Sequence, residues 1–76
     1  MNTELTEFIE LNPQVMTGKP VIKGTRITVE RIMEMVAAGD TVEDILEAYP
    51  HLTKEQILAA LRFATNIFKN EEIYPL

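Results

Sequence analysis

The sequence lacks cysteine and contains one histidine, His51, and these scarcities exclude several kinds of chemistry. Without cysteine the chain can form no disulfide, no thiolate zinc site and no cysteine nucleophile. A single histidine cannot build a His-rich metal cluster. Long apolar runs are also missing, because the longest one, residues 57–61, is far shorter than the roughly 18 residues that a membrane span needs. We therefore expect a chain that does not cross a membrane.

Basic residues are scarce as well. Seven Lys and Arg face twelve Asp and Glu, so the net charge is −5, which argues against strong nonspecific binding of nucleic acid. Residues 1–10 contain three glutamates and no basic residue, the opposite of a signal or transit peptide, so we expect a cytoplasmic protein. A chain of 76 residues makes one small domain with little core, so a partner or a homodimer is expected.

The N-terminal third predicts a small β element. Residues 7–11 favour a short strand that stops at Asn12-Pro13, a turn-favouring pair. Residues 21–22 and 26–28 favour strands on either side of Gly24, which can adopt the positive φ of a tight turn. An isolated ribbon is marginal in water, so this one must pack on helices or on another chain.

Three amphipathic helices are predicted after the ribbon, capped by Thr28, Thr41 and Thr53. Gly39 and Pro50 end the first two, and the third is expected to stop near residues 68–69. The sequence thus predicts a mainly α protein: a three-helix, helix-turn-helix-like bundle with a small N-terminal β element, forming one domain over residues 1–69 and a tail over residues 70–76. The predicted core stripes are Val29, Ile32, Met33 and Val36; Val42, Ile45, Leu46 and Tyr49; and Ile57, Ala60, Leu61, Ala64 and Phe68.

More apolar residues are present than these stripes require. Met35 lies off the stripe of the first helix, and Leu58, Phe63 and Ile67 lie beside or beyond the stripe of the third. One interpretation is a broad core face in a very small protein, where scattered exposed apolar residues are normal. The other is a second apolar surface for dimerisation or partner binding, with Phe63 and Ile67 as candidate contacts.

Charge is segregated along the chain. Residues 1–17 carry −3, residues 18–31 carry +3 and residues 32–76 carry −5. The positive segment makes Lys19, Lys23 and Arg26 candidate partner-binding residues on the predicted ribbon. For Arg26 the alternative is a structural ion pair with a nearby acid such as Glu30 or Glu7.

Only three residues, 50–52, separate the second and third helices, which is the connection length of a helix-turn-helix. In that motif the third helix would enter the major groove, and Lys54, Gln56 and Arg62 are its candidate DNA contacts. The alternative for Lys54 and Arg62 is simple surface solubility. The second helix carries Glu43, Asp44 and Glu47, which would repel phosphates unless they point away.

Catalytic chemistry is not expected. Gly18-Lys19 fails as a phosphate-binding loop, because Pro20 follows the lysine where Ser or Thr is required. The carboxylates of residues 40–47 fit helix starts and a solvated face better than a magnesium site. His51 has no evident nucleophile or orienting partner, so we expect neither an enzyme nor a bound cofactor or metal.

Residues 18–29, with the sequence GKPVIKGTRITV, together with a later YPHLT and AAL, resemble the family first catalogued as domain of unknown function 433. The resemblance covers about residues 7–65, and it departs at Thr17, where the family often has a second glycine. It implies a compact helix-turn-helix-like domain with a small β element. Members of the family are often encoded beside a PIN-like ribonuclease toxin and are regarded as VapB-type antitoxins, whereas many others have no assigned partner.

Three functional hypotheses follow. The first is an antitoxin-like protein that binds and neutralises a PIN-like ribonuclease toxin and also regulates its own operon by binding operator DNA. The second is a stand-alone dimeric DNA-binding regulator. The third is a protein-interaction module that never meets nucleic acid. We favour the first, because it combines the resemblance with the basic segment.

Overall fold

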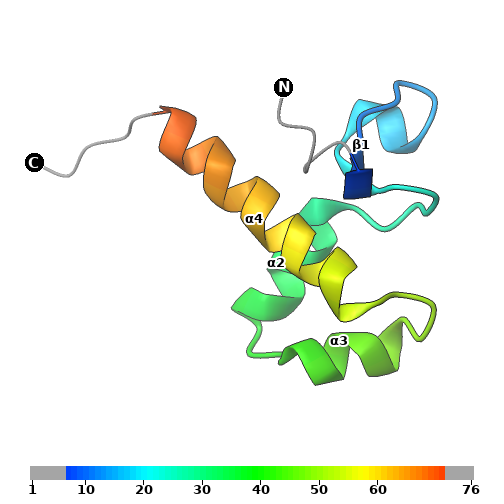
Figure 1. The fold of residues 1–76 in the computed structure, drawn as a ribbon, viewed down its shortest axis with the longest axis vertical. Coiled ribbons are helices and arrows are strands. Elements are labelled where there is room, and N and C mark those ends of the chain that lie inside the picture. Colours follow the sequence, from blue (N-terminus) through cyan, green and yellow to red (C-terminus); the bar gives the residue numbers. More distant parts are fainter. Residues whose placement is uncertain (1–6, 72–76) are drawn as a thin grey trace, which may run out of the picture.

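The computed structural model describes the backbone of residues 7–71 and the side chains of residues 7–66. A short strand, β1 (Ile9–Glu10), is followed by a turn of 3-10 helix, η1 (Met16–Gly18), and a second strand, β2 (Val21–Ile22). Three helices follow in the described part of the chain: α2 (Val29–Ala37), α3 (Val42–Ala48) and α4 (Lys54–Glu71). The predicted class is confirmed: the protein is mainly α, with three helices after a small antiparallel β element (Figure 1).

The β element is a compact ribbon. Strands β1 and β2 are antiparallel, with Ile9 opposite Ile22 and Glu10 opposite Val21. The chain then returns along the other side of β2, where the N–H of Ile22 donates to the carbonyl of Ile27 at 2.9 Å and Val21 bridges to Thr28. Both strands pack against α4. The helix thus supplies the support that a ribbon of this size needs in water.

Each helix begins at a threonine, as predicted. Thr28 Oγ1 accepts the N–H of Arg31 at 2.9 Å, which satisfies one of the free donors in the first turn of α2. The same arrangement starts α3 and α4, where it forms two reciprocal capping boxes. Their pairs are Thr41 with Asp44 (2.9 and 3.1 Å) and Thr53 with Gln56 (2.7 and 3.2 Å).

The core lies mainly between α2 and α4, which cross in Figure 1, with α3 closing one end and the ribbon the other. Its largest fully buried side chains are Val21, Ile22, Ile32, Ile45 and Ile57. Phe8, Ile27, Met33, Val42, Leu46, Tyr49, Leu61 and Phe63 are partly buried around them. Leu52 and Ile57, on either side of the α4 cap, are both buried, as a hydrophobic staple requires.

The predicted stripe of α2 is wrong in one place. Met35 is buried and Val36 is exposed, the reverse of the expectation. The buried row of α2 is Val29, Ile32 and Met35, spaced by three residues. Residues three positions apart are displaced by about 60° around an α-helix, so a row with that spacing runs obliquely across the helix surface. Such an oblique row can stay in contact with a second helix that crosses the first at an angle. By the last turn, the face toward the core has therefore moved from Val36 to Met35.

Helix α4 continues to Glu71, slightly past the predicted end at residues 68–69. No proline or glycine interrupts the sequence between Lys54 and Glu71 that would stop it earlier. The C-terminal end of α4 projects away from α2 and α3 (Figure 1). Phe68, predicted to complete the α4 core stripe, has a side chain outside the described residues.

Candidate interaction surface

The most prominent basic feature is the turn of residues 23–26, which joins β2 to the returning segment. Its backbone is tightly fixed: the N–H of Lys23 donates to the carbonyl of Phe8 at 2.7 Å, and the N–H of Thr25 donates to the carbonyl of Ile22 at 2.9 Å. Gly24 has a φ of 82°, which a residue with a side chain adopts only at a cost. The turn therefore has one well-defined shape.

The hydroxyl of Thr25 braces this turn from inside. Thr25 Oγ1 donates to the carbonyl of Ile22 at 2.7 Å and accepts the N–H of Ile27 at 3.0 Å. These two bonds bracket Arg26, so its backbone is fixed on both sides. Lys23 and Arg26 are both exposed, and neither forms an ion pair with any other residue that the structure describes. The turn thus presents two positive charges that are free to meet a partner.

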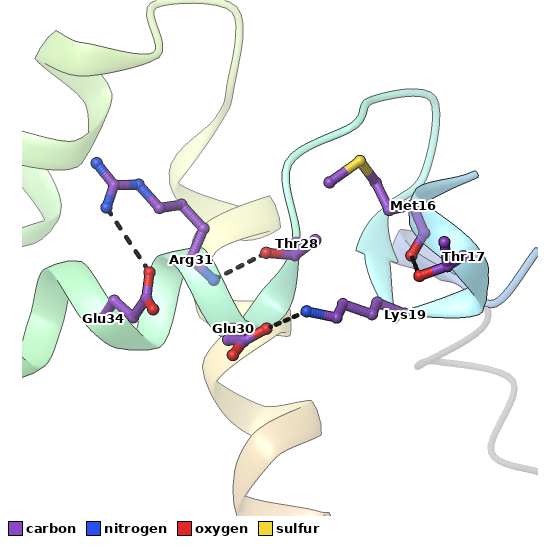
Figure 2. A network of polar contacts seen from close by, with 7 residues as sticks. All are labelled: Met16, Thr17, Lys19, Thr28, Glu30, Arg31 and Glu34. Carbon is purple, nitrogen blue, oxygen red and sulfur yellow. Dashed lines mark hydrogen bonds and ion pairs between the residues drawn. The ribbon is translucent and has the colours of Figure 1, made fainter.

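Lys19, predicted to belong to the same basic patch, lies elsewhere. Its Nζ donates to Glu30 Oε1 at 2.9 Å, in the first turn of α2 (Figure 2). The hydrogen bond and the charge of Glu30 raise the pKa of the Lys19 ammonium. Lys23 lies four positions further along a largely extended segment, so the Cα atoms of the two lysines are roughly 13 Å apart. The basic segment is therefore divided into an unpaired turn and a neutralised pair.

The ion pair of Lys19 also settles the alternative proposed for Arg26. Glu30 is the partner of Lys19 and not of Arg26. Glu7 forms no ion pair with Arg26 among the described residues either. The structural ion pair expected as one possibility for Arg26 is thus wrong for both named acids.

A polar link that the sequence did not reveal joins α2 to the end of α3. Arg31 Nε donates to Tyr49 Oη at 3.4 Å, and Arg31 Nη1 lies 3.7 Å from Glu34 Oε1 (Figure 2 shows the pair with Glu34). The hydrogen bond to Tyr49 is the largest cause that raises the pKa of the Arg31 guanidinium. Arg31 is exposed, but it is engaged with Tyr49 and Glu34, unlike the two cations of the turn.

The three candidate DNA contacts on α4 do not share one face. Lys54 and Arg62 are exposed and project within about 80° of each other around the helix axis. Gln56 projects about 120–160° away from both, and it is half-buried. Its Oε1 accepts the N–H of Thr53, so that oxygen serves the capping box. Lys54 and Arg62 share an exposed side of α4, about 12 Å apart along the helix axis.

The acidic residues of α3 face solvent. Glu43 and Glu47 are exposed and lie one turn apart, on the side of α3 away from buried Ile45. Asp44 is also exposed, and its Oδ2 accepts the N–H of Thr41 in the capping box. In a helix-turn-helix complex this helix would cross the DNA backbone, so the orientation of Glu43 and Glu47 decides whether phosphates can approach.

The predicted apolar contact surface is only partly present. Phe63 is half-buried and packs against the core, and Met35 belongs to the core itself. The side chain of Ile67 lies outside the described residues. Leu58 is half-buried and lies one helical turn from the exposed residues Lys54 and Arg62. Met35 and Phe63, two of the four surplus apolar residues, therefore follow the interpretation of a broad core in a small protein.

Other kinds of site are not visible in the part of the chain that the structure describes. No group of three or more His, Asp or Glu residues within that part is arranged to hold a metal ion. None of its helices combines the length and the apolar character that crossing a bilayer would require.

This arrangement is that of a small helical domain with a basic ribbon turn, and similarity to known proteins agrees with the resemblance seen in the sequence. The family model described as "Protein of unknown function (DUF433)" matches residues 9–64, well over half of the chain. The chain belongs to this family.

One curated relative is the uncharacterized protein y4eO of Sinorhizobium fredii (strain NBRC 101917 / NGR234). It is 41% identical over 58 residues, which cover 76% of this chain and 26% of that protein. The match therefore spans only about a quarter of the relative's length. No solved structure matches the chain.

Proposed function

We propose that this chain is an antitoxin-like protein that binds and neutralises a PIN-like ribonuclease toxin in the cytoplasm. The observation that carries the proposal is the rigid turn of residues 23–26, with Lys23 and Arg26 exposed and unpaired among the described residues. A PIN-like nuclease holds magnesium with carboxylates, so its active-site cleft is acidic. A guanidinium matches a carboxylate bidentately, which makes Arg26 the stronger of the two candidate contacts.

The rigidity of the turn supports this role. A binding element that already has its bound shape loses less conformational entropy on association. The bonds of Thr25 to Ile22 and Ile27 fix the backbone on both sides of Arg26. Lys19 is the weakest of the three predicted contacts, because its ion pair with Glu30 would have to be exchanged for a new one. Phe63 and Ile67 remain candidate apolar contacts with the toxin or with a second copy in a homodimer.

Regulation of the operon by DNA binding is proposed as a second role, with Lys54 and Arg62 as the phosphate or base contacts. Their shared exposed side of α4 supports it. The solvent-facing Glu43 and Glu47 on α3 weaken it, as does the use of Gln56 Oε1 in a cap. The stand-alone DNA-binding regulator is the alternative that depends on the same residues, and the protein-interaction module is the one that needs none of them.

The proposal predicts that a PIN-like nuclease is encoded beside this protein's gene, and the test uses that nuclease. The two proteins are co-expressed, and the purified nuclease is assayed on RNA with magnesium, with and without this protein. We expect a complex and loss of ribonuclease activity. The double variant Lys23→Glu/Arg26→Glu should weaken binding by about 10–100-fold, because close charge pairs at interfaces contribute strongly.

The matched control is Lys54→Glu/Arg62→Glu, which changes net charge equally at two exposed positions outside the turn. It should inhibit the nuclease as the wild type does. If the wild type neither binds nor inhibits the neighbouring nuclease, or if both double variants weaken binding equally, the proposed role of the turn is wrong.

DNA binding is tested separately by mobility shift at low salt with the region upstream of the gene. Wild type should shift this DNA, and Lys54→Ala/Arg62→Ala should not. Absence of a shift with wild type would remove the DNA role and leave toxin neutralisation standing.

A further inference from the structure

The loop that joins β1 to β2 is the least charged part of the chain. Residues 11–18 form its longest run without Asp, Glu, Lys or Arg. Among the side chains that the structure describes, three large hydrophobic ones are exposed, and this loop carries two of them: Leu11 at 53% and Met16 at 39%. The third, Val36 at 39%, lies on α2. The loop is thus a neutral, partly apolar surface on a chain of net charge −5.

The loop also has an unusual backbone. Met16 and Thr17 have φ values of 50° and 55°, and Gly18 has 82°, so three consecutive residues are left-handed. This conformation is unfavourable for residues with a side chain, and most of all for β-branched Thr17. It is held by hydrogen bonds from the N–H of Gly18 to Val15 and from the N–H of Lys19 to Met16, both at 3.1 Å. Figure 2 shows this segment beside the Lys19–Glu30 pair.

Strained backbone of this kind concentrates at binding and switch sites, where its shape has a use. Here the strained residues include Met16, one of the exposed apolar side chains. The strain and the exposed apolar surface are separate observations, and they coincide at Met16. Together they make the loop a candidate contact surface.

We propose that residues 11–18 are a self-association surface through which two copies of this chain meet. The argument for a second copy comes from charge. Two chains of −5 repel each other, so they associate best where both are neutral, and the loop is neutral while its neighbour Lys19 is balanced by Glu30. A two-fold axis would place Leu11 and Met16 of each copy against the same loop of the other. This surface is distinct from the basic turn.

The experiment is sedimentation velocity with the full chain over about a hundredfold range of concentration, without nuclease or DNA. We expect a concentration-dependent dimer. Met16→Glu should raise the dimer dissociation constant by about tenfold or more, because it places a charge in an apolar contact, and Leu11→Glu/Met16→Glu should raise it further. The matched control is Val36→Glu, which adds the same charge at an equally exposed side chain and should leave the dimer unchanged.

Circular dichroism establishes that each variant is folded, and Leu11→Ser, which adds no charge, replaces any glutamate variant that is not. A monomeric wild type at all concentrations overturns the inference, as does an equal effect of Met16→Glu and Val36→Glu. A wild-type monomer whose Met16→Glu variant loses only nuclease binding also overturns it, since the loop would then contact the toxin. Because the assay contains no nuclease, its result is independent of the toxin proposal.

Discussion

The ammonium of Lys19 lies 2.9 Å from the carboxylate of Glu30 and joins the loop between the strands to the first turn of α2. The pair raises the pKa of Lys19 above its ordinary value of 10.5. A raised pKa means that the contribution of the pair to stability is complete below pH 10.5 and is lost as the pH rises through the folded-state pKa.

Replacing Glu30 with glutamine should therefore lower the pKa of Lys19, because the carboxylate that favours the charged form is gone. NMR titration of the Lys19 side chain in wild type and in Glu30→Gln measures the change. An unchanged Lys19 pKa in the variant would show that the two side chains do not interact in solution.

The burial of Met35 and the exposure of Val36 give a stability prediction. Met35→Ala should lower the free energy of unfolding by about 2 kcal/mol or more, because it leaves a cavity between α2 and the rest of the core. Val36→Ala should lower it by less than about 1 kcal/mol, since Val36 is exposed. Urea denaturation of both variants measures the difference, and equal losses would contradict the assignment of Met35 to the core.

The cap of α4 gives a second stability prediction. Thr53→Ala should lower the free energy of unfolding by about 0.5–2 kcal/mol, because the N–H of Gln56 loses its acceptor. Thr65→Ala is the control within the same helix. Thr65 is exposed and its hydroxyl only donates to the carbonyl of Leu61, so its removal should be neutral or slightly stabilising. Thermal unfolding of the two variants should separate them clearly.

The left-handed residues make opposite predictions at two sites. Thr17→Gly should raise the free energy of unfolding by up to about 1 kcal/mol, because glycine adopts a φ of 55° without strain. Gly39→Ala, at a φ of 101° with open space around it, should lower the same quantity by about 1 kcal/mol. A loss of stability in Thr17→Gly would show that the threonine side chain contributes more than its backbone conformation costs.

The features that sequence analysis predicted correctly are those with local causes. The caps at Thr28, Thr41 and Thr53 depend on residues three positions apart, so the spacing along the chain is enough to find them. The same holds for the tight turn at Gly24. The class of fold followed from the periodicity of the three helices.

The features that it missed depend on contacts between distant segments. Lys19 and Glu30 are eleven residues apart, and Arg31 and Tyr49 are eighteen apart, so neither pairing has a local signal. The burial of Met35 in place of Val36 depends on how α2 crosses α4, which periodicity within one helix does not specify. For Thr17, the departure from the glycine common in the family was the available signal of its left-handed backbone.

The packing of β1 and β2 on α4 has a consequence for synthesis of the chain. Strands β1 and β2 are synthesised before α4, the helix that packs against both of them, and Ile9, Val21 and Ile22 are buried in the folded chain. While the nascent chain is still attached to the ribosome, these three side chains face water or the exit tunnel. The packing of the ribbon can be completed only after α4 emerges, and until then β1 and β2 are accessible to chaperones and proteases.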